Sequence, residues 1–544
     1  MKDKKKVNSK HKNFKKPMKK AHSHSGFSKE MKLKDINLNT KGSATIVGEI
    51  VRIAQTGGPT IFMISDGTGS LALKGFIKAG ERAYPEIEEG DCVKANVSIG
   101  EYQGEIEGSI IKISKLDEKE KTDFLMSLKI IQMERAKVIP PEFMVKDKIL
   151  DKLKDRFIQA ATQIRLAIIQ DRPIIVRHHN DADGYSSGFA LERAILPLII
   201  EQHSSLKAPW EYFLRAPCMA PLYEIDDSIR DTANSLRNVA KFSNKMPLII
   251  IADNGSSPED YMAIKQGKIH GADFIVIDHH GFDEDVISSE VLTHINPFLV
   301  GEDGSHFSAG MLCAEFARFV NPKVENISQI PAMAGFADKI ELGNPQVMDQ
   351  YLRIAESEGY TKELLSDIAL VIDYVSAKVR FMEVREYIEV LFGEPRDKQR
   401  ELVSLLAPYI RNLDSKGLAI GKSNAKHKKI GDVVLQTIEI EETFPGFGFF
   451  PKPGRAVSLV HDDYQKEEKV DALVTAGVMN TAITMRATDA ANFSVHDLIV
   501  YLNKEYPDAF VNGGGHKNAG SISFLPYMKD KVVDGLKDFI KSRR

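Results

Sequence analysis

The chain has few cysteines, a single tryptophan and no long apolar run. Its three cysteines, Cys92, Cys218 and Cys313, lie far apart and form no Cys-x-x-Cys pair, so neither a disulfide framework nor a zinc ribbon is expected. No apolar stretch approaches the ~18–20 residues that a membrane-spanning helix needs. The N-terminus is basic and carries no apolar segment of the kind found in secretory signals. We therefore expect a soluble protein of the cytoplasm with no membrane partner.

The net charge of −3 conceals an uneven distribution along the chain. The first 34 residues hold thirteen lysines against Asp3 and Glu30, a net charge of +11 that leaves −14 for the remainder. Because this region has almost no apolar periodicity, residues 1–36 are predicted to be a disordered basic arm. Its expected role is non-specific attraction to phosphate. The alternative is a tail that only adds solubility.

Residues 37–116 have the pattern of a small β-barrel. Five short stretches alternate apolar and polar residues and are separated by glycine turns, which is typical of strands. The segment resembles nucleic-acid-binding OB domains, and its candidate stacking platforms for bases are Phe62, Phe76 and Tyr102. Some of these aromatic residues must belong to the barrel core, and the sequence alone does not distinguish them. The five predicted strands cover residues 44–51, 61–69, 71–76, 92–97 and 108–113.

Metal-ligand side chains follow three apolar runs in the middle of the chain. The runs 173–177, 247–252 and 272–277 are short and rich in β-branched residues, as are parallel strands covered on both faces. In open α/β sheets, ligands bind beyond the carboxyl ends of such strands, so the polar groups that follow are expected to share one crevice. These groups are His-His-Asn-Asp-Ala-Asp-Gly at 178–184, Asp-Asn-Gly at 253–255 and Asp-His-His at 278–280.

The ligand types indicate the kind of metal. Carboxylates and imidazoles without thiolates suit manganese or magnesium better than structural zinc. His179, Asp181, Asp183, Asp253 and His279 are too many ligands for one ion. Two ions about 3.5–4 Å apart are a common device for hydrolysing phosphate esters. Alone, Asp-x-Asp-Gly is often a turn and His-His is often on the surface, but three such clusters at three strand ends favour a metal site.

At these motifs the chain resembles the DHH phosphoesterase superfamily, specifically its RecJ-like nucleases. The resemblance extends from about residue 150 to the C-terminus, and the three clusters match the first three motifs of the family. Asp338, in Gly-Phe-Ala-Asp-Lys, matches the fourth motif, whereas by itself it would be a helix-surface carboxylate. The resemblance implies two Mn²⁺ ions, with Mg²⁺ possible, held by His179, Asp181, Asp183, Asp253, His279 and Asp338.

A glycine-rich motif near the C-terminus gives an independent indication. Consecutive glycines allow backbone N–H groups to approach an anion closely, although such a stretch is often only a turn. Here it matches the Gly-Gly-Gly-His signature of the DHH-associated substrate domain, which argues against the inorganic pyrophosphatases of the superfamily. The resemblance implies that substrate phosphates are bound by Gly513, Gly514, Gly515 and His516, with Arg486.

We therefore predict an α/β protein with a parallel-sheet DHH catalytic domain, a smaller α/β substrate domain and an N-terminal OB-like β-barrel. A helical connector joins the barrel to the catalytic domain, and a helical linker or insertion precedes the substrate domain. For this insertion, ordinary packing is the default expectation. The predicted boundaries are 1–36, 37–116, 117–152, 153–344, 345–429 and 430–544.

The predicted function is a two-metal-dependent exonuclease that hydrolyses single-stranded nucleic acid to nucleoside monophosphates. Action in the 5′→3′ direction on single-stranded DNA, in replication or repair, is favoured over action on RNA. Following the superfamily pattern, Asp253 bridges the ions, His280 is a hydrogen-bond donor or general acid near the scissile phosphate, and Asp278 orients the histidines.

The position of the OB-like module, before the catalytic domain, resembles archaeal RecJ-like proteins, some of which associate with the GINS complex of the replication machinery. Replication proteins of the GINS type are therefore expected partners. Two alternatives stay open. One is a phosphodiesterase for short oligonucleotides or cyclic dinucleotides, and the other is a replisome scaffold without activity.

Overall fold

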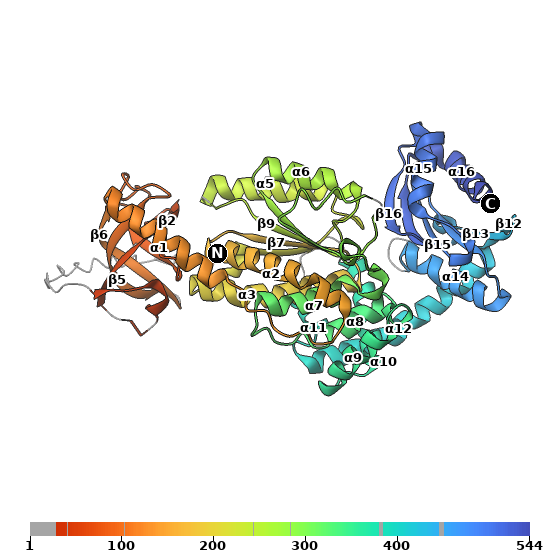
Figure 1. The fold of residues 1–544 in the computed structure, drawn as a ribbon, viewed down its shortest axis with the longest axis horizontal. Coiled ribbons are helices and arrows are strands. Elements are labelled where there is room, and N and C mark those ends of the chain that lie inside the picture. Colours follow the sequence, from red (N-terminus) through yellow and green to blue (C-terminus); the bar gives the residue numbers. More distant parts are fainter. Residues whose placement is uncertain are drawn as a thin grey trace, which may run out of the picture.

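Three folded parts follow one another along the chain in the computed structural model (Figure 1). The structure describes residues 29–37, 39–40, 42–102, 104–242, 244–282, 284–379, 385–444 and 451–543. Most of the predicted basic arm therefore lies outside the described residues.

The first part is a closed barrel of five strands. Each strand pairs with its neighbours, and pairing between β2 and β5 closes the sheet on itself. Buried and exposed residues alternate along the strands because one face lines the barrel interior. The predicted strands are confirmed. They are β2 (Gly42–Gln55), β3 (Thr60–Ser65), β4 (Ser70–Gly75), β5 (Cys92–Tyr102) and β6 (Glu105–Lys115), with a short β1 (Lys29–Glu30) added in parallel to β2.

The prediction that Phe62 is a stacking platform is wrong. Its side chain is completely buried and meets the ring of Tyr84 edge to face, with 6.2 Å between the ring centroids. Phe62 lies on the same side of β3 as the buried Ile64, so it belongs to the barrel core. By contrast, Phe76 is 63% exposed and Tyr102 is 56% exposed, and the ammonium of Lys74 lies 4.4 Å from the centre of the Tyr102 ring.

The barrel is docked through a polar interface on the predicted catalytic domain, which keeps that name below. Ser70 on β4 donates its hydroxyl to the buried carboxylate of Asp171, with distances of 2.7 and 2.8 Å to the two oxygens. Arg52 on β2 donates to the side-chain oxygen of Asn244 at 2.9 Å. The helical connector is α1 (Glu118–Ala136), which is capped by Asp117. The barrel is therefore held in a defined position.

The catalytic domain is built on a five-stranded parallel sheet in the order β11-β10-β9-β7-β8. Every residue of β7 and β9 is buried because helices cover both faces. This arrangement confirms the three predicted central strands. The strands are β7 (Ile174–His178), β8 (Phe213–Pro217), β9 (Leu248–Ala252), β10 (Asp273–Ile277) and β11 (Thr293–Ile295).

Helices form a layer on each side of this sheet (Figure 1). On one face, apolar side chains of three helices share a core with Ile174 and Ile250. On the other face, Ile175 and Ile249 pack against the buried side of α6. The first layer holds α2 (Lys148–Ile169), α3 (Ala182–His203) and α7 (Ala309–Val320), and the second holds α5 (Ile225–Phe242) and α6 (Tyr261–Ile269). The short α4 (Pro209–Tyr212) precedes β8.

The predicted helical insertion packs largely against the catalytic domain. Val347, Ile368 and Ile410 belong to the same buried core as Ile174 of the central sheet. Its long last helix then continues toward the C-terminal domain (Figure 1). The helices of this region are α9 (Pro345–Ser357), α10 (Lys362–Lys378), α11 (Arg385–Leu391) and α12 (Arg396–Asn424). The preceding helix, α8 (Ile330–Ala337), lies within the predicted catalytic domain.

The C-terminal domain is a six-stranded mixed sheet in the order β12-β13-β14-β15-β17-β16. Leu498 and Leu536, from two helices, share a core on one face, and Val457 and Val460 pack on the other. The edge strand β16 faces the catalytic domain (Figure 1). The strands are β12 (Lys426–Ile430), β13 (Val433–Glu439), β14 (Leu473–Val478), β15 (Ala482–Ala487), β16 (Asn512–His516) and β17 (Ala519–Ser523), and the helices are α13 (Ile440–Thr443), α14 (Pro453–Glu468), α15 (Val495–Glu505) and α16 (Lys529–Ser542).

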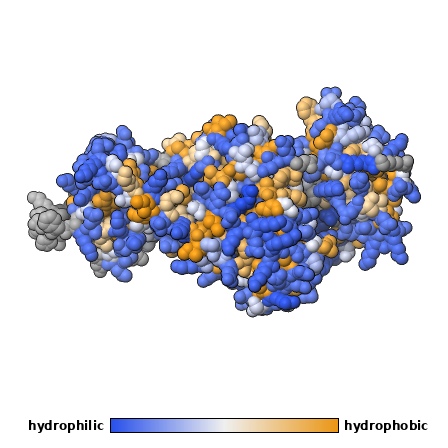
Figure 2. Space-filling view, in the orientation of Figure 1, coloured by the Kyte–Doolittle hydropathy of each residue, from blue (hydrophilic) through white to orange (hydrophobic). Residues whose placement is uncertain are grey.

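Apolar residues on the visible surface gather in patches over the central part of the molecule, whereas the two ends are mostly hydrophilic (Figure 2). Among the described residues, no helix combines the length and the apolar character needed to cross a membrane.

Candidate metal centre

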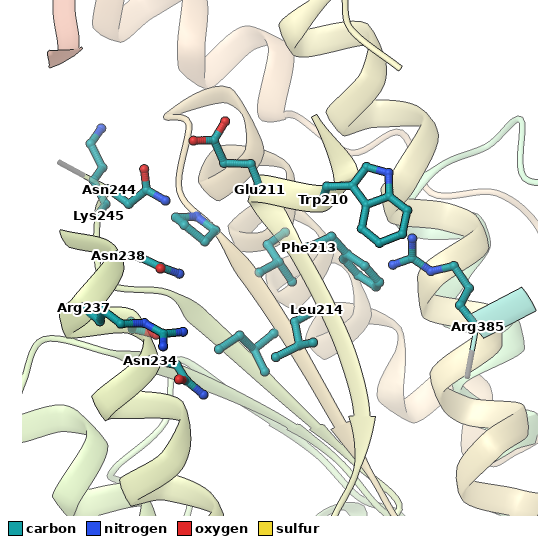
Figure 3. Close-up of a pocket in the computed structure, with 14 residues that line it drawn as sticks. Trp210, Glu211, Phe213, Leu214, Asn234, Arg237, Asn238, Asn244, Lys245 and Arg385 are labelled. Atoms are coloured by element: carbon teal, nitrogen blue, oxygen red, sulfur yellow. The ribbon is translucent and has the colours of Figure 1, made fainter. Parts of the chain in front are cut away.

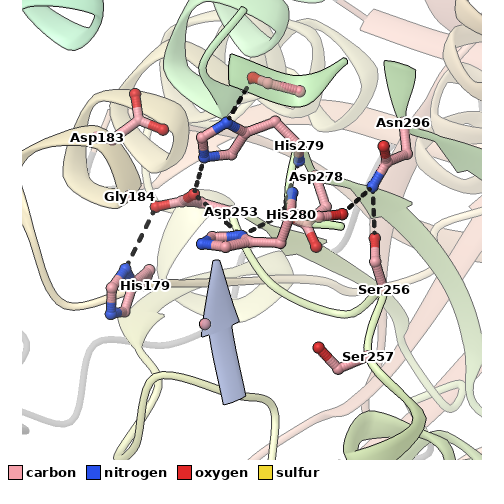
Figure 4. A network of polar contacts seen from close by, with 12 residues as sticks. His179, Asp183, Gly184, Asp253, Ser256, Ser257, Asp278, His279, His280 and Asn296 are labelled. Carbon is pink, nitrogen blue, oxygen red and sulfur yellow. Dashed lines mark hydrogen bonds and ion pairs between the residues drawn. The ribbon is translucent and has the colours of Figure 1, made fainter. Parts of the chain in front are cut away.

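The strand register places the three predicted clusters side by side. Ala252 of β9 pairs with His178 of β7 and with Ile277 of β10. The residues that follow these three strands therefore emerge in one row at the carboxyl edge of the sheet. Figure 4 shows His179, Asp253 and His279 turned toward one another at this edge.

Two acidic side chains reach the cluster from the start of α3. Asp181 caps the helix, because one of its oxygens accepts a hydrogen bond from the backbone N–H of Gly184 at 2.9 Å. Its second oxygen lies 2.8 Å from Nδ1 of His179. Asp183 accepts from the backbone N–H of Gly310 at 3.1 Å through one oxygen, and its other oxygen is buried and accepts no hydrogen bond from the described residues. Both carboxylates thus retain an oxygen for the cluster.

Asp253 lies at the centre of the cluster. Its backbone has a φ of 59°, which turns the chain sharply after β9 and is tolerated by Asp and Asn. The side chain is buried, and neither oxygen accepts a hydrogen bond from the described residues. Imidazole nitrogens lie close to these oxygens, at 3.5 Å for His179, 3.4 Å for His279 and 3.9 Å for His280.

The orientation of His279 is fixed from behind. Its Nδ1 lies 3.1 Å from the carbonyl oxygen of Gly304, so Nδ1–H donates there and Nε2 faces the cluster. That Nε2 is 3.2 Å from a carboxylate oxygen of Asp338, which follows α8. Gly304 is required for this contact because a β-carbon at that position would overlap the carbonyl oxygen of His279.

His280 is bound to Asp278 rather than to the centre of the cluster. Its Nδ1 is 2.7 Å from Asp278, whose same oxygen accepts the backbone N–H groups of His279 and His280. Burial acts to lower the pKa of His280, but the charge of Asp278 prevails and raises it above its usual value. The same pairing holds the pKa of Asp278 below its usual range despite burial. A network through Asn296 and Ser256 adjoins this pair (Figure 4).

The electrostatics of the cluster favour a bound cation. Burial, followed by the nearby charges of Asp253 and Asp338, raises the pKa of Asp183 well above its usual value. Burial opposes protonation of His179 and His279, yet the surrounding carboxylates raise the pKa of both well above the usual value.

The geometry fits divalent ions as well. Ligand atoms that share an ion lie about 3 Å apart, since each is about 2.1 Å from it, and the nitrogen–oxygen separations given above are close to that spacing. Three overlapping groups of these side chains could each hold an ion, and each shares Asp253 or His279 with another. The groups are Asp253, His279 and His280; His179, Asp181 and Asp253; and Asp183, His279 and Asp338. All six predicted metal ligands are therefore brought together.

The glycine motif forms the hairpin of β16 and β17 (Figure 1). Gly513 and Gly515 are required by the hairpin itself, because a β-carbon would overlap Ser521 or Ala519 backbone atoms and Gly515 has a φ of 126°. Gly514 differs, since its β-carbon would meet only a side-chain atom of Leu222 in the catalytic domain, at 3.6 Å. Gly514 thus faces the space between the domains.

Of the two other predicted phosphate ligands, Arg486 lies near this hairpin. Arg486 is on β15, opposite Ala519 of β17. The side chain of His516 lies outside the described part of the chain. The structure therefore places the Gly-rich hairpin and Arg486 on neighbouring strands of the C-terminal sheet.

The sequence did not reveal two residues that border the cluster. Lys452, just before α14, donates to the backbone oxygen of Asn180 at 2.7 Å and to the hydroxyl of Ser376 at 2.9 Å. Asp373 on α10 accepts from the backbone N–H of Ala182 at 3.0 Å. No local pattern marks either residue, although the prolines on both sides of Lys452 indicate a fixed backbone.

Comparisons with known proteins agree with this architecture. The model of an OB-fold nucleic acid binding domain, of the tRNA anti-codon type, matches residues 44–116. An uncharacterized protein of Methanocaldococcus jannaschii is 34% identical over 530 residues, which cover 92% of this chain and 69% of the relative.

Two solved structures are similar to this chain. A chain described as the DHH domain of a member of a family of ribosomal proteins is 33% identical, with a TM-score of 0.72, over 78% of this chain and 99% of that one. RecJ from Thermus thermophilus in complex with Mn²⁺ shares the fold at 16% identity, with a TM-score of 0.50, over 75% of this chain and 57% of RecJ.

The fold and the cluster define a multidomain protein in which an OB module precedes a carboxylate–histidine centre able to hold a metal. The chain belongs to the DHH superfamily, with an OB-like N-terminal module, and its fold is RecJ-like.

Proposed function

We propose that this protein is a two-metal-dependent exonuclease that hydrolyses single-stranded nucleic acid to nucleoside monophosphates. The observation that supports it is the buried Asp253 carboxylate, which accepts no hydrogen bond from the described residues and is shared by two overlapping ligand groups. A buried charge without hydrogen bonds is costly unless a cation compensates it. Such an arrangement suits two ions bridged by one carboxylate.

The proposed ligands are the six side chains of the cluster other than His280. Asp253 would bridge two Mn²⁺ or Mg²⁺ ions, which when bound supply a hydroxide nucleophile and neutralise charge on the phosphate. Gly304 fixes the tautomer of His279 so that Nε2 faces the cluster, and Asp181 is fixed by its bond to Gly184. The protein thus holds its ligands in position before any ion arrives.

His280 is proposed to act on the substrate directly. Asp278 holds Nδ1 and so orients the ring, and Nε2 is the nitrogen proposed to contact a phosphate. The raised pKa keeps this imidazole protonated over a wider pH range, which suits a hydrogen-bond donor or a general acid. Asp278 would set its orientation and that of His279.

The C-terminal domain is proposed to bind the phosphates next to the one that is cut. Gly514 faces the catalytic domain at Leu222, and Arg486 is on a neighbouring strand. Gly513 and Gly515 would shape this hairpin, and His516 would donate to a phosphate. The distance between this domain and the metal centre would then determine where the strand is cut.

The N-terminal region favours a long substrate over a very small one. An OB module with exposed Phe76 and Tyr102 offers stacking surfaces, and the basic arm attracts polyanions. We favour 5′→3′ action on single-stranded DNA in replication or repair, with replication proteins of the GINS type as partners.

A polarity assay tests this function. Single strands of DNA and RNA, labelled at the 5′ or the 3′ end and both long and very short, would be incubated with Mn²⁺ or Mg²⁺. Mononucleotides released first from the 5′ end of long DNA are the expected products. Cleavage confined to dinucleotides or cyclic dinucleotides would support a small-substrate phosphodiesterase instead. Binding without cleavage under any of these conditions would support a scaffold.

A further inference from the structure

A cavity lies at the opposite edge of the catalytic sheet from the metal centre (Figure 3). Its volume is about 260 Å³, and it is lined by the amino ends of two strands, at Ile174 of β7 and Phe213 of β8. The parallel strands run from this edge to the metal centre, so the two sites are separated by about the length of a five-residue strand, roughly 16 Å. The cavity is therefore distinct from the proposed catalytic site.

One wall of this cavity is aromatic. Trp210, the only tryptophan of the chain, is 74% exposed here. The guanidinium of Arg385 is 5.9 Å from the Trp210 ring and 5.6 Å from the ring of Phe213. Arg385 is held from behind by the buried carboxylate of Glu192, at 3.2 Å. The wall therefore offers a large aromatic surface beside a positioned cation.

The opposite wall is polar and positively charged. Asn234, Arg237 and Asn238 project from α5, across the cavity from Trp210 (Figure 3). Lys245 adds a second cation to this side, and its ammonium donates to the backbone oxygen of Gln170 at 2.7 Å. Amides of this kind can pair with the edge of a base, and the cations can bind a phosphate.

The acidic residue in the lining, Glu211, already has a partner of opposite charge. Glu211 forms an ion pair with Arg52 of the OB barrel. Arg52 also donates to Asn244, another lining residue, so the barrel borders the cavity directly. Three cations therefore face one paired carboxylate, and the cavity is suited to an anion that carries an aromatic group.

We propose that this cavity is a second nucleotide-binding site, in which a base stacks on Trp210 while its phosphate lies between Arg237 and Lys245. The ligand has two possible sources with the same chemistry: a free mononucleotide, or one nucleotide of a single strand that also contacts the OB barrel. The ligand class follows from the lining residues. It does not depend on whether the metal centre cleaves anything.

The single tryptophan makes the test specific. We would titrate full-length protein in EDTA, so that nothing is hydrolysed, with adenosine 5′-monophosphate in one arm and a 20-nucleotide single strand in the other. The readout is Trp210 fluorescence, which a stacked base quenches. Saturable quenching is expected in at least one arm, and the arm that saturates identifies the source.

Variants connect the signal to this cavity. Arg237→Ala should raise the ligand concentration needed for half-maximal quenching roughly tenfold or more, because it removes a charge-assisted contact to the phosphate. Lys241→Ala, on the same helix but outside the lining, should not change it. Trp210→Ala should reduce binding of the mononucleotide in equilibrium dialysis by roughly 5- to 150-fold, the range for base–aromatic stacking.

The proposal is overturned if neither ligand quenches the fluorescence, or if Arg237→Ala and Lys241→Ala titrate alike. Quenching by an acidic peptide but not by either nucleotide ligand would also overturn it and would indicate a protein partner. Because the titration needs neither metal nor turnover, a positive result stands even if the polarity assay finds no cleavage. Equally, cleavage without quenching rejects only this site.

Discussion

Lys452 of the C-terminal domain donates a hydrogen bond to the backbone oxygen of Asn180, in the first motif of the catalytic domain, at 2.7 Å. The two residues are 272 positions apart in the chain. The contact joins the two domains beside the metal cluster. Burial acts to raise the pKa of Asp181, but His179, the backbone of Gly184 and then Lys452 lower this pKa below its usual value.

Replacing this lysine should impair the reaction. Lys452→Met removes two charge-assisted hydrogen bonds, which are each typically worth about 1.5–3 kcal/mol. We expect the single-turnover rate of hydrolysis to fall roughly tenfold or more, with the fold intact by circular dichroism. Lys537→Met is the control, because this lysine lies on the last helix of the C-terminal domain and its ion pair with the exposed Asp534 should contribute little. Equal effects of the two substitutions would show that Lys452 has no special role.

Asp253→Asn should remove activity without unfolding the protein. Asn tolerates the left-handed backbone at this position, but an amide cannot bridge two cations. Because metal catalysis supplies several kcal/mol, we expect at least a hundredfold loss of rate and a loss of bound metal in elemental analysis. Asp273→Asn, at the amino edge of the same sheet, should keep both properties. A wild-type metal content in Asp253→Asn would exclude this residue from the site.

Gly514→Val tests whether the glycine hairpin of β16 and β17 binds the substrate. The structure has room for a β-carbon at Gly514, 3.6 Å from Leu222, and the residue lies in a strand where valine is favourable. The side chain would instead fill the space between the domains. We expect a loss of single-turnover cleavage with bound metal unchanged. Normal cleavage would mean that this part of the motif is only a turn.

The OB barrel is best tested by point substitutions. Deleting the barrel would also expose the Asp171 carboxylate that Ser70 covers, so its effect would be difficult to interpret. Phe76→Ala and Tyr102→Ala should each weaken binding of a long strand by about 1–3 kcal/mol per stacked base, measured by fluorescence anisotropy. Dinucleotide hydrolysis should hardly change. Ile111→Ala, which removes an exposed aliphatic side chain from the same barrel, is the control.

The stability of the catalytic domain should fall at acidic pH because of His294. Burial lowers the pKa of His294 to about 4, and serine hydroxyls lie 2.9 Å from both ring nitrogens. The unfolded chain binds this proton at its usual pKa, near 6.5. Stability is therefore fully present above about pH 6.5 and is lost as the pH falls from about 6.5 to about 4.

This one residue should contribute a loss of about 2 kcal/mol in the free energy of unfolding between about pH 7 and about pH 5. Chemical denaturation followed by Trp210 fluorescence measures it, since that tryptophan lies in the same domain. His294→Gln should show a correspondingly flatter pH dependence than the wild type, whereas the exposed His270→Gln should not. Parallel pH profiles for all three proteins would refute the assignment.

The sequence alone determined the elements that carry the metal cluster. Short apolar runs predicted β7, β9 and β10, because strands buried on both faces must be apolar throughout. The same local logic predicted the barrel strands and placed the ligand residues directly after their strands. Since parallel strands in register end at one edge, the convergence of His179, Asp253 and His279 could also be predicted.

Only the tertiary structure decided which side chains are buried in a core and which make contacts between the folded parts. Alternation along β3 does not show which face lines the barrel, so Phe62 could be assigned to the core only from its surroundings. Lys452 reaches Asn180, and Trp210 shares a cavity with Arg237, only because distant segments pack together. Local patterns encode the period of a strand or a helix. Contacts between separately formed elements depend on how whole surfaces fit, and no short stretch of sequence carries that information.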